Sequence, residues 1–286
     1  MLGQSLGSLI LAYEAISYFV PDIFIDTMGY AFTLPFVSSV LEIPTAAYVH
    51  YPTISTDMLQ ALPGRSSIKR RYYKLFALAY GYACNQINVL VTNSSWTQNH
   101  MEQLTGPKRS FGEIQVIFPP CDTKTLTTLP LSPREKLIIY VAQFRPEKEH
   151  HIVLRSFSIL LTKNPELRDQ GAKLILIGSV RDERDRQRVD ALRKGSEFLG
   201  VQDKVEFICD APWDNVVEWL GRGWIGTNAM WNEHFGIGVV EYMAAGLIPV
   251  VHNSGGPKMD IVTEIDGKAT GMVVKLARTN RRVSCL

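Results

Sequence analysis

The stretch LIIYVAQFRPEKEH (Leu137–His150) joins an uninterrupted apolar run to a polar loop. A strand that is apolar along its whole length is typical of a parallel sheet covered on both faces, and parallel strands are connected through helices. We therefore predict a strand, a loop and the start of a helix. Arg145 and Lys148 lie in the loop, where a guanidinium fork and a compact ammonium can both reach a diphosphate. The alternative for this Arg-x-x-Lys pair is a solvated helix start.

Similar apolar runs recur on both sides of this stretch. In the second half we predict strands at 137–142, 173–178, 205–208 and 247–251, and in the first half at 22–26, 45–50, 87–92 and 114–118. An N-terminal helix, which we expect to be packed, precedes them and ends by Pro21. This alternation predicts an α/β fold with two doubly wound, Rossmann-like domains whose strand ends face each other across a cleft.

Proline and threonine punctuate the region between the two sets of strands. We assign residues 1–118 to the first domain, 119–136 to a linker, 137–274 to the second domain and 275–286 to an atypical tail. The 286 residues are 46% hydrophobic, which is enough to bury two cores. A net charge of +2 without a long basic block gives no support to nucleic-acid binding.

The four cysteines are far apart and form no C-x-x-C pair, so we predict neither a zinc site nor a disulfide framework. Gln4 and Glu14 interrupt the N-terminal apolar run, and no positive segment precedes it. We therefore predict no signal peptide and no transmembrane segment in this chain.

The stretch NEHFGIGVVEYMAAG (Asn232–Gly246) sets two carboxylates eight positions apart around a glycine-spaced turn. Gly236 and Gly238 leave backbone N–H groups uncovered where a helix begins, and a helix start favours a phosphate or a sugar hydroxyl. We place Glu233 before the helix and Glu241 in its first turn. Glu241 can then accept hydrogen bonds from a ribose diol, while Glu233 can face the transferred sugar.

With both loops in one domain, the sequence resembles the retaining GT-B glycosyltransferases of family 4, whose signature is a Glu, seven residues and a second Glu. Within that family the chain is similar to the α-1,2-mannosyltransferases that assemble the N-glycan precursor. The segments that carry this resemblance are residues 27–36, 48–59, 91–97, 230–246 and 252–262, and it extends from Met1 to about Thr263.

The resemblance implies transfer of mannose from GDP-mannose, held by the second domain, to a dolichol-linked oligosaccharide held by the first. Arg145 and Lys148 would neutralise the diphosphate, Glu241 would hold the ribose and Glu233 would contact the mannose. Backbone N–H groups of Phe235, Gly236, Ile237 and Gly238 would complete the cradle, and His50 would contact a sugar; without the resemblance, His50 is most simply a satisfied histidine at a strand end.

The same resemblance implies no metal cofactor, in agreement with the absence of an Asp-x-Asp triplet. A carboxylate nucleophile is one route to retention. We prefer a positioning role for Glu233, because acceptors in this family are thought to attack on the face that the phosphate leaves. Other pathway mannosyltransferases are further expected partners.

Some features depart from the family. Most members have Arg where this chain has Gln143. A glycine-rich loop expected before Met1 is absent, and the segment KLARTNRRVSCL (Lys275–Leu286) does not resemble the closing helices. We therefore expect both domains to be incomplete, and the chain as written to be poorly soluble and inactive. The full-length protein would reside at the endoplasmic reticulum membrane on its cytosolic face.

The segment SSIKRRYYKLFALAYGYA (Ser66–Ala83) combines basic and aromatic residues at helical spacing. Such a helix can lie on an anionic membrane surface and deliver a polyprenol-linked acceptor. The alternative is a helix that faces the core, with Lys and Arg at its rim.

Two other functions stay open. The chain could be an inactive fragment that binds only nucleotide or a partner, or it could be another sugar-nucleotide enzyme of the same architecture. A phosphorylase would need a pyridoxal-carrying lysine context that we do not identify. The residues alone support only a nucleoside diphosphate sugar.

Overall fold

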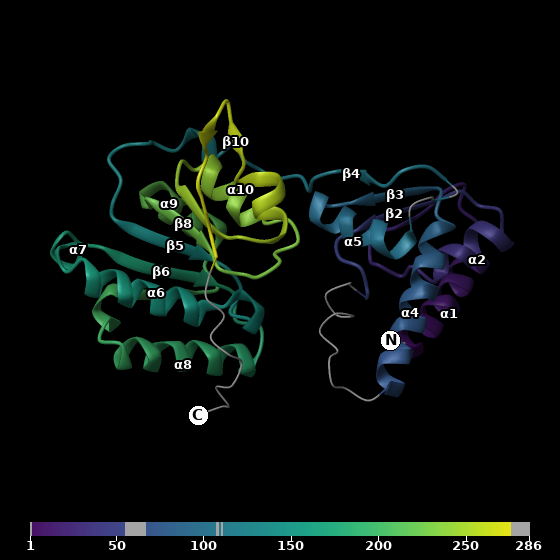
Figure 1. The fold of residues 1–286 in the computed structure, drawn as a ribbon, viewed down its shortest axis with the longest axis horizontal. Coiled ribbons are helices and arrows are strands. Elements are labelled where there is room, and N and C mark those ends of the chain that lie inside the picture. The colour runs from purple at the N-terminus through teal and green to yellow at the C-terminus, as the bar shows by residue number, and fades with distance from the viewer. Residues whose placement is uncertain (1, 55–66, 107–108, 110, 276–286) are drawn as a thin grey trace. The chain divides into compact units, whose positions relative to one another are not determined.

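The computed structural model describes residues 2–54, 67–106, 109 and 111–275 (Figure 1). The chain forms two compact units, Met1–Pro119 and Pro120–Leu286, which are described separately. The predicted tail lies outside the described residues apart from Lys275. The predicted cleft between the two domains stays a prediction.

Unit 1 is a parallel sheet with the strand order β1-β2-β3-β4. Its elements are α1 (Leu2–Tyr18), β1 (Phe24–Asp26), α2 (Thr33–Val40), β2 (Thr45–Val49), α4 (Ser67–Asn85), β3 (Val89–Thr92), α5 (Ser95–Thr105) and β4 (Gln115–Val116). Each predicted strand of the first half is present, although β4 is shorter than expected.

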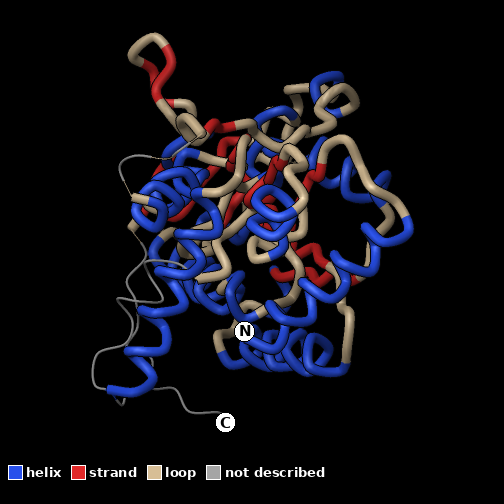
Figure 2. Tube along the Cα trace, turned by 90° about the vertical axis from the view of Figure 1, so that its right-hand side faces the viewer, coloured by secondary structure: helices blue, strands red, loops and turns tan. Residues whose placement is uncertain are grey.

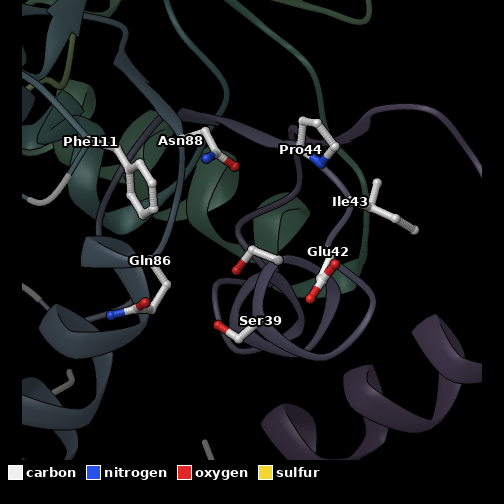
Figure 3. Close-up of a pocket in the computed structure, with 8 residues that line it drawn as sticks. Ser39, Glu42, Ile43, Pro44, Gln86, Asn88 and Phe111 are labelled. Carbon is white, nitrogen blue, oxygen red and sulfur yellow. The ribbon is translucent and has the colours of Figure 1, made fainter.

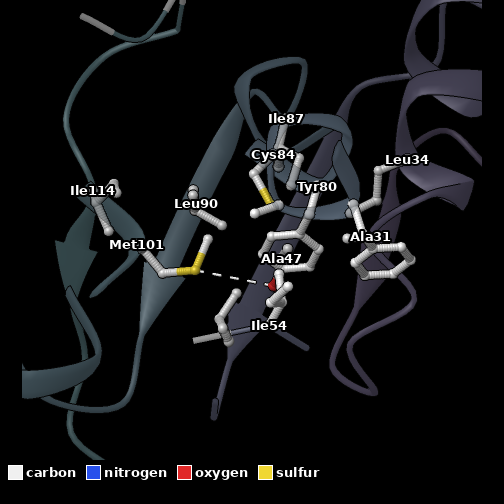
Figure 4. Packing of buried hydrophobic residues seen from close by; sticks show 13 residues of the cluster. Ala31, Leu34, Ala47, Ile54, Tyr80, Cys84, Ile87, Leu90, Met101 and Ile114 are labelled. Atoms are coloured by element: carbon white, nitrogen blue, oxygen red, sulfur yellow. Dashed lines mark hydrogen bonds between the residues drawn. The ribbon is translucent and has the colours of Figure 1, made fainter. Parts of the chain in front are cut away.

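The buried residues of unit 1 gather in one cluster, drawn in Figure 4. Tyr80 of α4 lies at its centre, and its hydroxyl contacts the Met101 sulfur of α5 at 4.0 Å. On the sheet, Ala47 and Leu90 contribute to this cluster and are register partners, so their side chains point to the same face. Ile25 points to the opposite face and is 64% exposed. The described core of unit 1 therefore lies on one face of its sheet.

Helix α1 is packed, as expected, but only along part of its surface. Ser8 and Ala12 are buried, but Leu6, Ile10 and Tyr13 are each more than 60% exposed. The helix packs against α2 along a narrow stripe, and the rest of its apolar surface faces outward. Within the described ranges, no helix combines the length and apolar character that crossing a bilayer requires.

Unit 2 has a six-stranded parallel sheet with the order β12-β9-β8-β5-β6-β7. Its strands are β5 (Leu137–Val141), β6 (Lys173–Gly178), β7 (Val205–Cys209), β8 (Ile225–Asn228), β9 (Ile248–His252) and β12 (Met272–Val274). The helices and turns are η1 (Leu126–Thr128), η2 (Pro146–Lys148), α6 (His150–Lys163), α7 (Glu166–Asp169), α8 (Glu183–Phe198), η3 (Gln202–Lys204), α9 (Trp213–Arg222), α10 (Ile237–Ala244) and η4 (Pro257–Ile261).

The chain runs from β5 through β6 to β7 on one side of the sheet and then returns to β8, on the other side of β5. The order therefore reverses between β5 and β8. In open parallel sheets, ligands bind at the carboxyl ends of the strands at such a switch point.

The two faces of this sheet have separate cores. Tyr140, Leu174 and Leu176 pack under α6 and α8, whereas Ile139 and Ile175 pack under α9 and α10. Because successive strand residues alternate between faces, the continuous apolar runs seen in the sequence are what this two-sided covering needs. Unit 2 is doubly wound, as predicted, and Figure 1 shows the two helix pairs on opposite sides of the sheet.

The segment between Pro120 and β5 packs onto unit 2. Leu126 is fully buried in the core under α9 and α10. The Arg134 guanidinium donates from Nη1 to the carbonyls of Leu220 and Gly223, and from Nη2 to that of Ala245. Residues that we predicted as a linker thus contribute to the unit that follows them.

A two-stranded hairpin projects from unit 2 and was not predicted. It consists of β10 (Glu264–Ile265) and β11 (Lys268–Ala269), joined by Asp266 and Gly267, both with positive φ. An Asp-Gly pair favours this tight turn. Figures 1 and 2 both show the hairpin extending away from the sheet.

Candidate functional site

The candidate site lies at the carboxyl edge of the unit 2 sheet, at the switch point between β5 and β8. The loop after β5 carries Arg145 and Lys148, and the loop after β8 carries Glu233. Since β5 and β8 are neighbours, residues far apart in the sequence meet here. The predicted position of Lys148 and Glu233 in one domain and on one edge agrees with this arrangement.

The Lys148 ammonium forms an ion pair with the Glu233 carboxylate, with 2.5 Å between Nζ and Oε2. Their side chains are only 21% and 15% exposed. Asn228 Nδ2 donates to the same oxygen at 3.4 Å, and the Tyr140 hydroxyl donates to the Lys148 carbonyl at 2.5 Å. A charge-assisted bond that is shielded from water is stronger than a surface ion pair, so this contact fixes the two loops together.

Arg145 lies on the same loop at the start of η2, and its Nη1 is 3.9 Å from Glu147 Oε1. Its Nε is buried and donates to none of the described residues. A buried guanidinium N–H without an acceptor is uncommon in proteins, and a ligand oxygen would satisfy it.

Helix α10 begins at Ile237, after Gly236 with φ of 108°. Our placement of Glu241 in the first turn is wrong, because the fifth residue of the helix opens the second turn. Glu241 nevertheless stays beside the turn: a Cβ at Gly238 would lie 3.9 Å from Glu241 Oε2. Burial raises the pKa of Glu241 above its usual range.

The first N–H groups of α10 have no acceptor within the helix. Val239 and Val240 both donate to the Gly236 carbonyl, and Phe235 and Gly236 are buried. Ile237 is 43% exposed and Gly238 is half-buried, so these two are the more accessible of the four predicted cradle residues.

His50 belongs to unit 1 and directly follows β2, which ends one residue before the predicted strand end. It is exposed, and its ring meets the Tyr48 ring edge-on at 4.9 Å. Thr97 Oγ1 donates to the His50 carbonyl at 3.5 Å. The role of His50 beside the donor sugar stays a prediction.

Sequence reasoning missed several residues of the site. Tyr242 is buried, and its hydroxyl accepts the Val141 N–H at 2.7 Å on β5, beyond the point where β8 stops pairing. Burial raises the pKa of Tyr242. Burial and the Glu241 charge raise the pKa of Cys121. Tyr242 directly follows a predicted site residue, but its hydrogen bond depends on strand order.

Unit 1 contains a pocket at the other end of its own sheet (Figure 3). Pro44 and Asn88, which line it, come before β2 and β3, whereas His50 comes after β2. Its volume is about 140 Å³, below the roughly 300 Å³ at which ligand pockets begin. We assign no function to this pocket. Among the residues that the structure describes, no three His, Cys, Asp or Glu side chains come together in a way that could hold a metal ion.

Two sequence families match the chain. The ALG11 mannosyltransferase N-terminus matches residues 1–105. The family described as glycosyl transferases group 1 matches residues 125–278, more than half of the chain.

Curated relatives named GDP-Man:Man(3)GlcNAc(2)-PP-Dol alpha-1,2-mannosyltransferase are similar to almost the whole chain. The protein from Neurospora crassa is 47% identical over 95% of this chain and 55% of its own length. The human protein is 44% identical over 96% of this chain and 59% of its own length. The chain thus spans about half the length of the curated relatives it matches.

Solved structures of low sequence identity share the fold. The Anabaena protein Alr3699/HepE, solved in complex with UDP, has a TM-score of 0.68 at 17% identity, over 95% of this chain and 68% of that one. An α,α-trehalose-phosphate synthase (UDP-forming) from Burkholderia vietnamiensis has a TM-score of 0.68 at 12% identity, over 89% of this chain and 65% of that one. The expected GT-B class, with two Rossmann-like α/β units, is confirmed.

Proposed function

The chain belongs to the group 1 glycosyl transferases, and we propose that it transfers mannose from GDP-mannose to a dolichol-diphosphate-linked oligosaccharide, forming an α-1,2 bond with retention. The observation that carries the proposal is the Lys148–Glu233 ion pair at the switch point of unit 2. It links the loop that would hold a diphosphate to the carboxylate that would hold a sugar. The names of relatives at 44% and 47% identity support the choice of donor and acceptor.

Lys148 and Arg145 stabilise the leaving group. As the glycosidic bond breaks, negative charge grows on the β-phosphate, and a fixed cation there lowers the barrier more than it tightens substrate binding. The unsatisfied Nε of Arg145 is available for a phosphate oxygen. In the proposed reaction, these two cations and the start of α10 stabilise the negative charge of the diphosphate, which a metal ion would otherwise stabilise. The proposed reaction therefore needs no metal.

Glu233 positions the sugar and does not act as a nucleophile. Its Oε2 already accepts hydrogen bonds from Lys148 and Asn228, and a carboxylate so engaged is a poor nucleophile. Retention then requires that the acceptor hydroxyl attack from the face that the diphosphate leaves. The other carboxylate oxygen, Oε1, can accept a hydrogen bond from a mannose hydroxyl.

Glu241 and the start of α10 hold the nucleoside side of the donor. The carboxylate accepts hydrogen bonds from the ribose diol, and the N–H groups of Ile237 and Gly238, with those of Phe235 and Gly236 behind them, form the phosphate cradle. His50, which belongs to unit 1, contacts the sugar.

The acceptor is a lipid-linked sugar, so we propose that unit 1 touches a membrane surface, at the cytosolic face of the endoplasmic reticulum. Helix α4 turns Phe76 and Tyr80 into the core and exposes Leu75 and Leu78. Arg70, Arg71 and Lys74 are exposed on the same helix. An apolar face bordered by cations suits an anionic headgroup layer. Other mannosyltransferases of the pathway are proposed partners at that surface.

The test uses labelled GDP-mannose and a dolichol-diphosphate-linked Man3GlcNAc2 acceptor. The expected product carries label that an α-1,2-mannosidase releases. Lys148→Met should lower turnover at least roughly tenfold, because it removes the leaving-group cation and leaves Glu233 unpaired. The matched control is Lys163→Met at the exposed end of α6, which should leave turnover unchanged.

Calorimetry with GDP, UDP and ADP completes the experiment. Preference for GDP supports the donor. GDP binding without transfer would favour the alternative that the chain only binds nucleotide, and would agree with the expectation that it is inactive as written. Preference for UDP or ADP would favour another transferase of the family. Failure of all three to bind would overturn the donor site itself.

A further inference from the structure

The segment His252–Gly256, which begins at the last residue of β9, is hydrogen-bonded to the loop that carries Glu233. Two hydrogen bonds join these segments, one at the residue before Glu233 and one at the Glu233 carbonyl. The Asn232 N–H donates to Ser254 Oγ at 2.8 Å, and the Gly256 N–H donates to the Glu233 carbonyl at 2.8 Å. Both loops come from neighbouring strands, β8 and β9, so the contact is a direct product of the sheet order.

The two loops touch backbone to backbone. A Cβ at Gly255, whose φ is +72°, would lie 2.2 Å from the Glu233 carbonyl oxygen, and one at Gly256 would lie 2.6 Å from Phe235 Cα. Real Cβ atoms do not approach so closely, so these positions accept only glycine without a shift of the Glu233 loop. The Glu233 backbone therefore has a rigid support.

Asn232 adopts a left-handed conformation, with φ of 54°. Residues with a side chain avoid this region, and Asn tolerates it better than most. Asn232 directly precedes Glu233, so its backbone conformation determines the direction in which the Glu233 side chain points. Its N–H is the group that Ser254 holds.

His252 in turn orients Ser254. His252 Nδ1 and Ser254 Oγ are 2.7 Å apart, and a hydroxyl can accept one hydrogen bond from a backbone N–H while it shares another with an imidazole. The contacts run from His252 to Ser254, to the Asn232 turn, to Glu233 and to Lys148. Nothing in the proposed mechanism uses Ser254 or His252 directly.

We propose that Ser254, oriented by His252, is a positioning residue that holds the left-handed Asn232 turn and thereby aims Glu233 at the donor sugar. This inference rests on the proposed role of Glu233. It gives Ser254 no contact with the donor, so its effect appears only in ligands that contain the sugar.

The test compares GDP-mannose with GDP, which lacks the sugar, on the full chain. Ser254→Ala should weaken GDP-mannose binding by roughly five- to tenfold, the usual effect of one hydrogen bond, and leave GDP binding within about twofold. Ser254→Thr, which keeps the hydroxyl, should restore the ratio of the two affinities. A side chain that only supports the fold would lower both affinities alike.

A second pair of variants tests the path through Asn232. Asn232→Gly adopts the left-handed turn without a side-chain penalty, so Ser254→Ala should have a smaller effect on the affinity ratio in the Asn232→Gly background than alone. The proposal is overturned if Ser254→Ala weakens the binding of GDP-mannose and of GDP equally, so that the ratio of the two affinities is unchanged. It is also overturned if the effects of the two substitutions on this ratio are fully additive.

The failure of the proposed function is distinguishable from these outcomes. If the unsubstituted chain binds GDP but discriminates no sugar, then the Glu233 role fails before Ser254 is tested. If Ser254→Ala does not fold, the Ser254→Thr and Asn232→Gly variants still report the ratio of GDP-mannose affinity to GDP affinity. An unchanged ratio in Asn232→Gly together with a lowered ratio in Ser254→Thr would contradict the positioning role.

Discussion

At the scale of single residues, the two glutamates of the site have different surroundings. Glu233 is paired with Lys148 and hydrogen-bonded by Asn228. Burial raises the pKa of the Glu241 carboxyl. In the proposed mechanism, the first carboxylate contacts the sugar and the second accepts hydrogen bonds from the ribose. Substitutions at the two positions should therefore affect different measurements.

Glu233→Gln should lower mannose transfer at least roughly tenfold while GDP affinity changes little, because the sugar contact is lost and the phosphate loop remains. Glu241→Gln should weaken GDP binding by a similar factor, since an amide accepts fewer hydrogen bonds from the ribose diol. Turnover measurements and calorimetry on both variants check this. The exposed Glu218→Gln on α9 is the matched control, and a reversed pattern would exchange the two roles.

At the scale of elements, the start of α6 is built around a buried imidazole. His150 is the first residue of the helix, and its ring lies 4.8 Å from that of Phe144 and 4.9 Å from that of Tyr140. Burial, with a smaller contribution from the charge of Lys148, lowers the pKa of His150 to about 4. A neutral His150 therefore stabilises the start of α6, which follows the loop that carries Arg145 and Lys148.

Acid should loosen this element through His150. Between its folded pKa of about 4 and the usual value near 6.5, the unfolded chain binds a proton that the folded chain does not. The free energy of unfolding of unit 2 should thus rise with pH across this window, and fall by on the order of 2–3 kcal/mol as pH drops from about 6.5 to about 4.

Urea unfolding at a series of pH values measures the effect. His150→Phe keeps an aromatic ring and removes the titration, so its stability should change less with pH over this window. His151→Phe is the control, because that ring is largely exposed. If the two variants show the same pH dependence, His150 is not the group responsible.

The elements that the sequence predicts best are those with unbroken apolar runs. Strand β6 occupies the predicted residues 173–178, since both of its faces are covered. Strand β8 was missed because Gly226 and Thr227 interrupt its run. The structure supplies the reason: a Cβ at Gly226 would lie 2.2 Å from the Tyr242 ring. A glycine that weakens the strand pattern makes room for a residue of the site.

The sequence predicts the individual residues of the candidate site, but it does not predict the contacts between them. Lys148 and Glu233 were assigned to one ligand from their loops, yet their ion pair spans 85 positions and depends on β5 lying beside β8. Asn228 and Ser254 carry no signal of their own in the sequence, because each acts through hydrogen bonds to a loop on a neighbouring strand.

At the scale of the whole molecule, unit 1 differs from unit 2 in how much apolar surface it presents. Leu6, Ile10 and Tyr13 of α1 and Leu75 and Leu78 of α4 are all exposed. Single exposed apolar residues are normal on a protein surface, but here several occur together on each of two helices. Such apolar surfaces mark sites of interaction. The basic residues of α4 favour a lipid headgroup layer as the partner.

The chain should float with liposomes that contain about a third anionic lipid and less with neutral ones, because cations near the surface each contribute on the order of 1 kcal/mol. Replacing Leu75 and Leu78 with glutamate should abolish flotation. A matched double substitution on unit 2, Ile159→Glu with Phe198→Glu, removes exposed apolar residues elsewhere and should leave flotation unchanged. Equal loss in both variants would indicate general stickiness.

The Arg134 guanidinium, whose three acceptors lie at the ends of α9 and α10, has a consequence for how unit 2 can be excised. A fragment that starts at Leu137, the first strand residue, would lose this guanidinium and Leu126 together. A protease that cuts just before β5 should therefore destabilise the fragment it releases, whereas a cut before Pro120 should not. Recombinant 120–275 should melt several degrees above 137–275 in a thermal scan, and equal melting temperatures would show that the segment is dispensable.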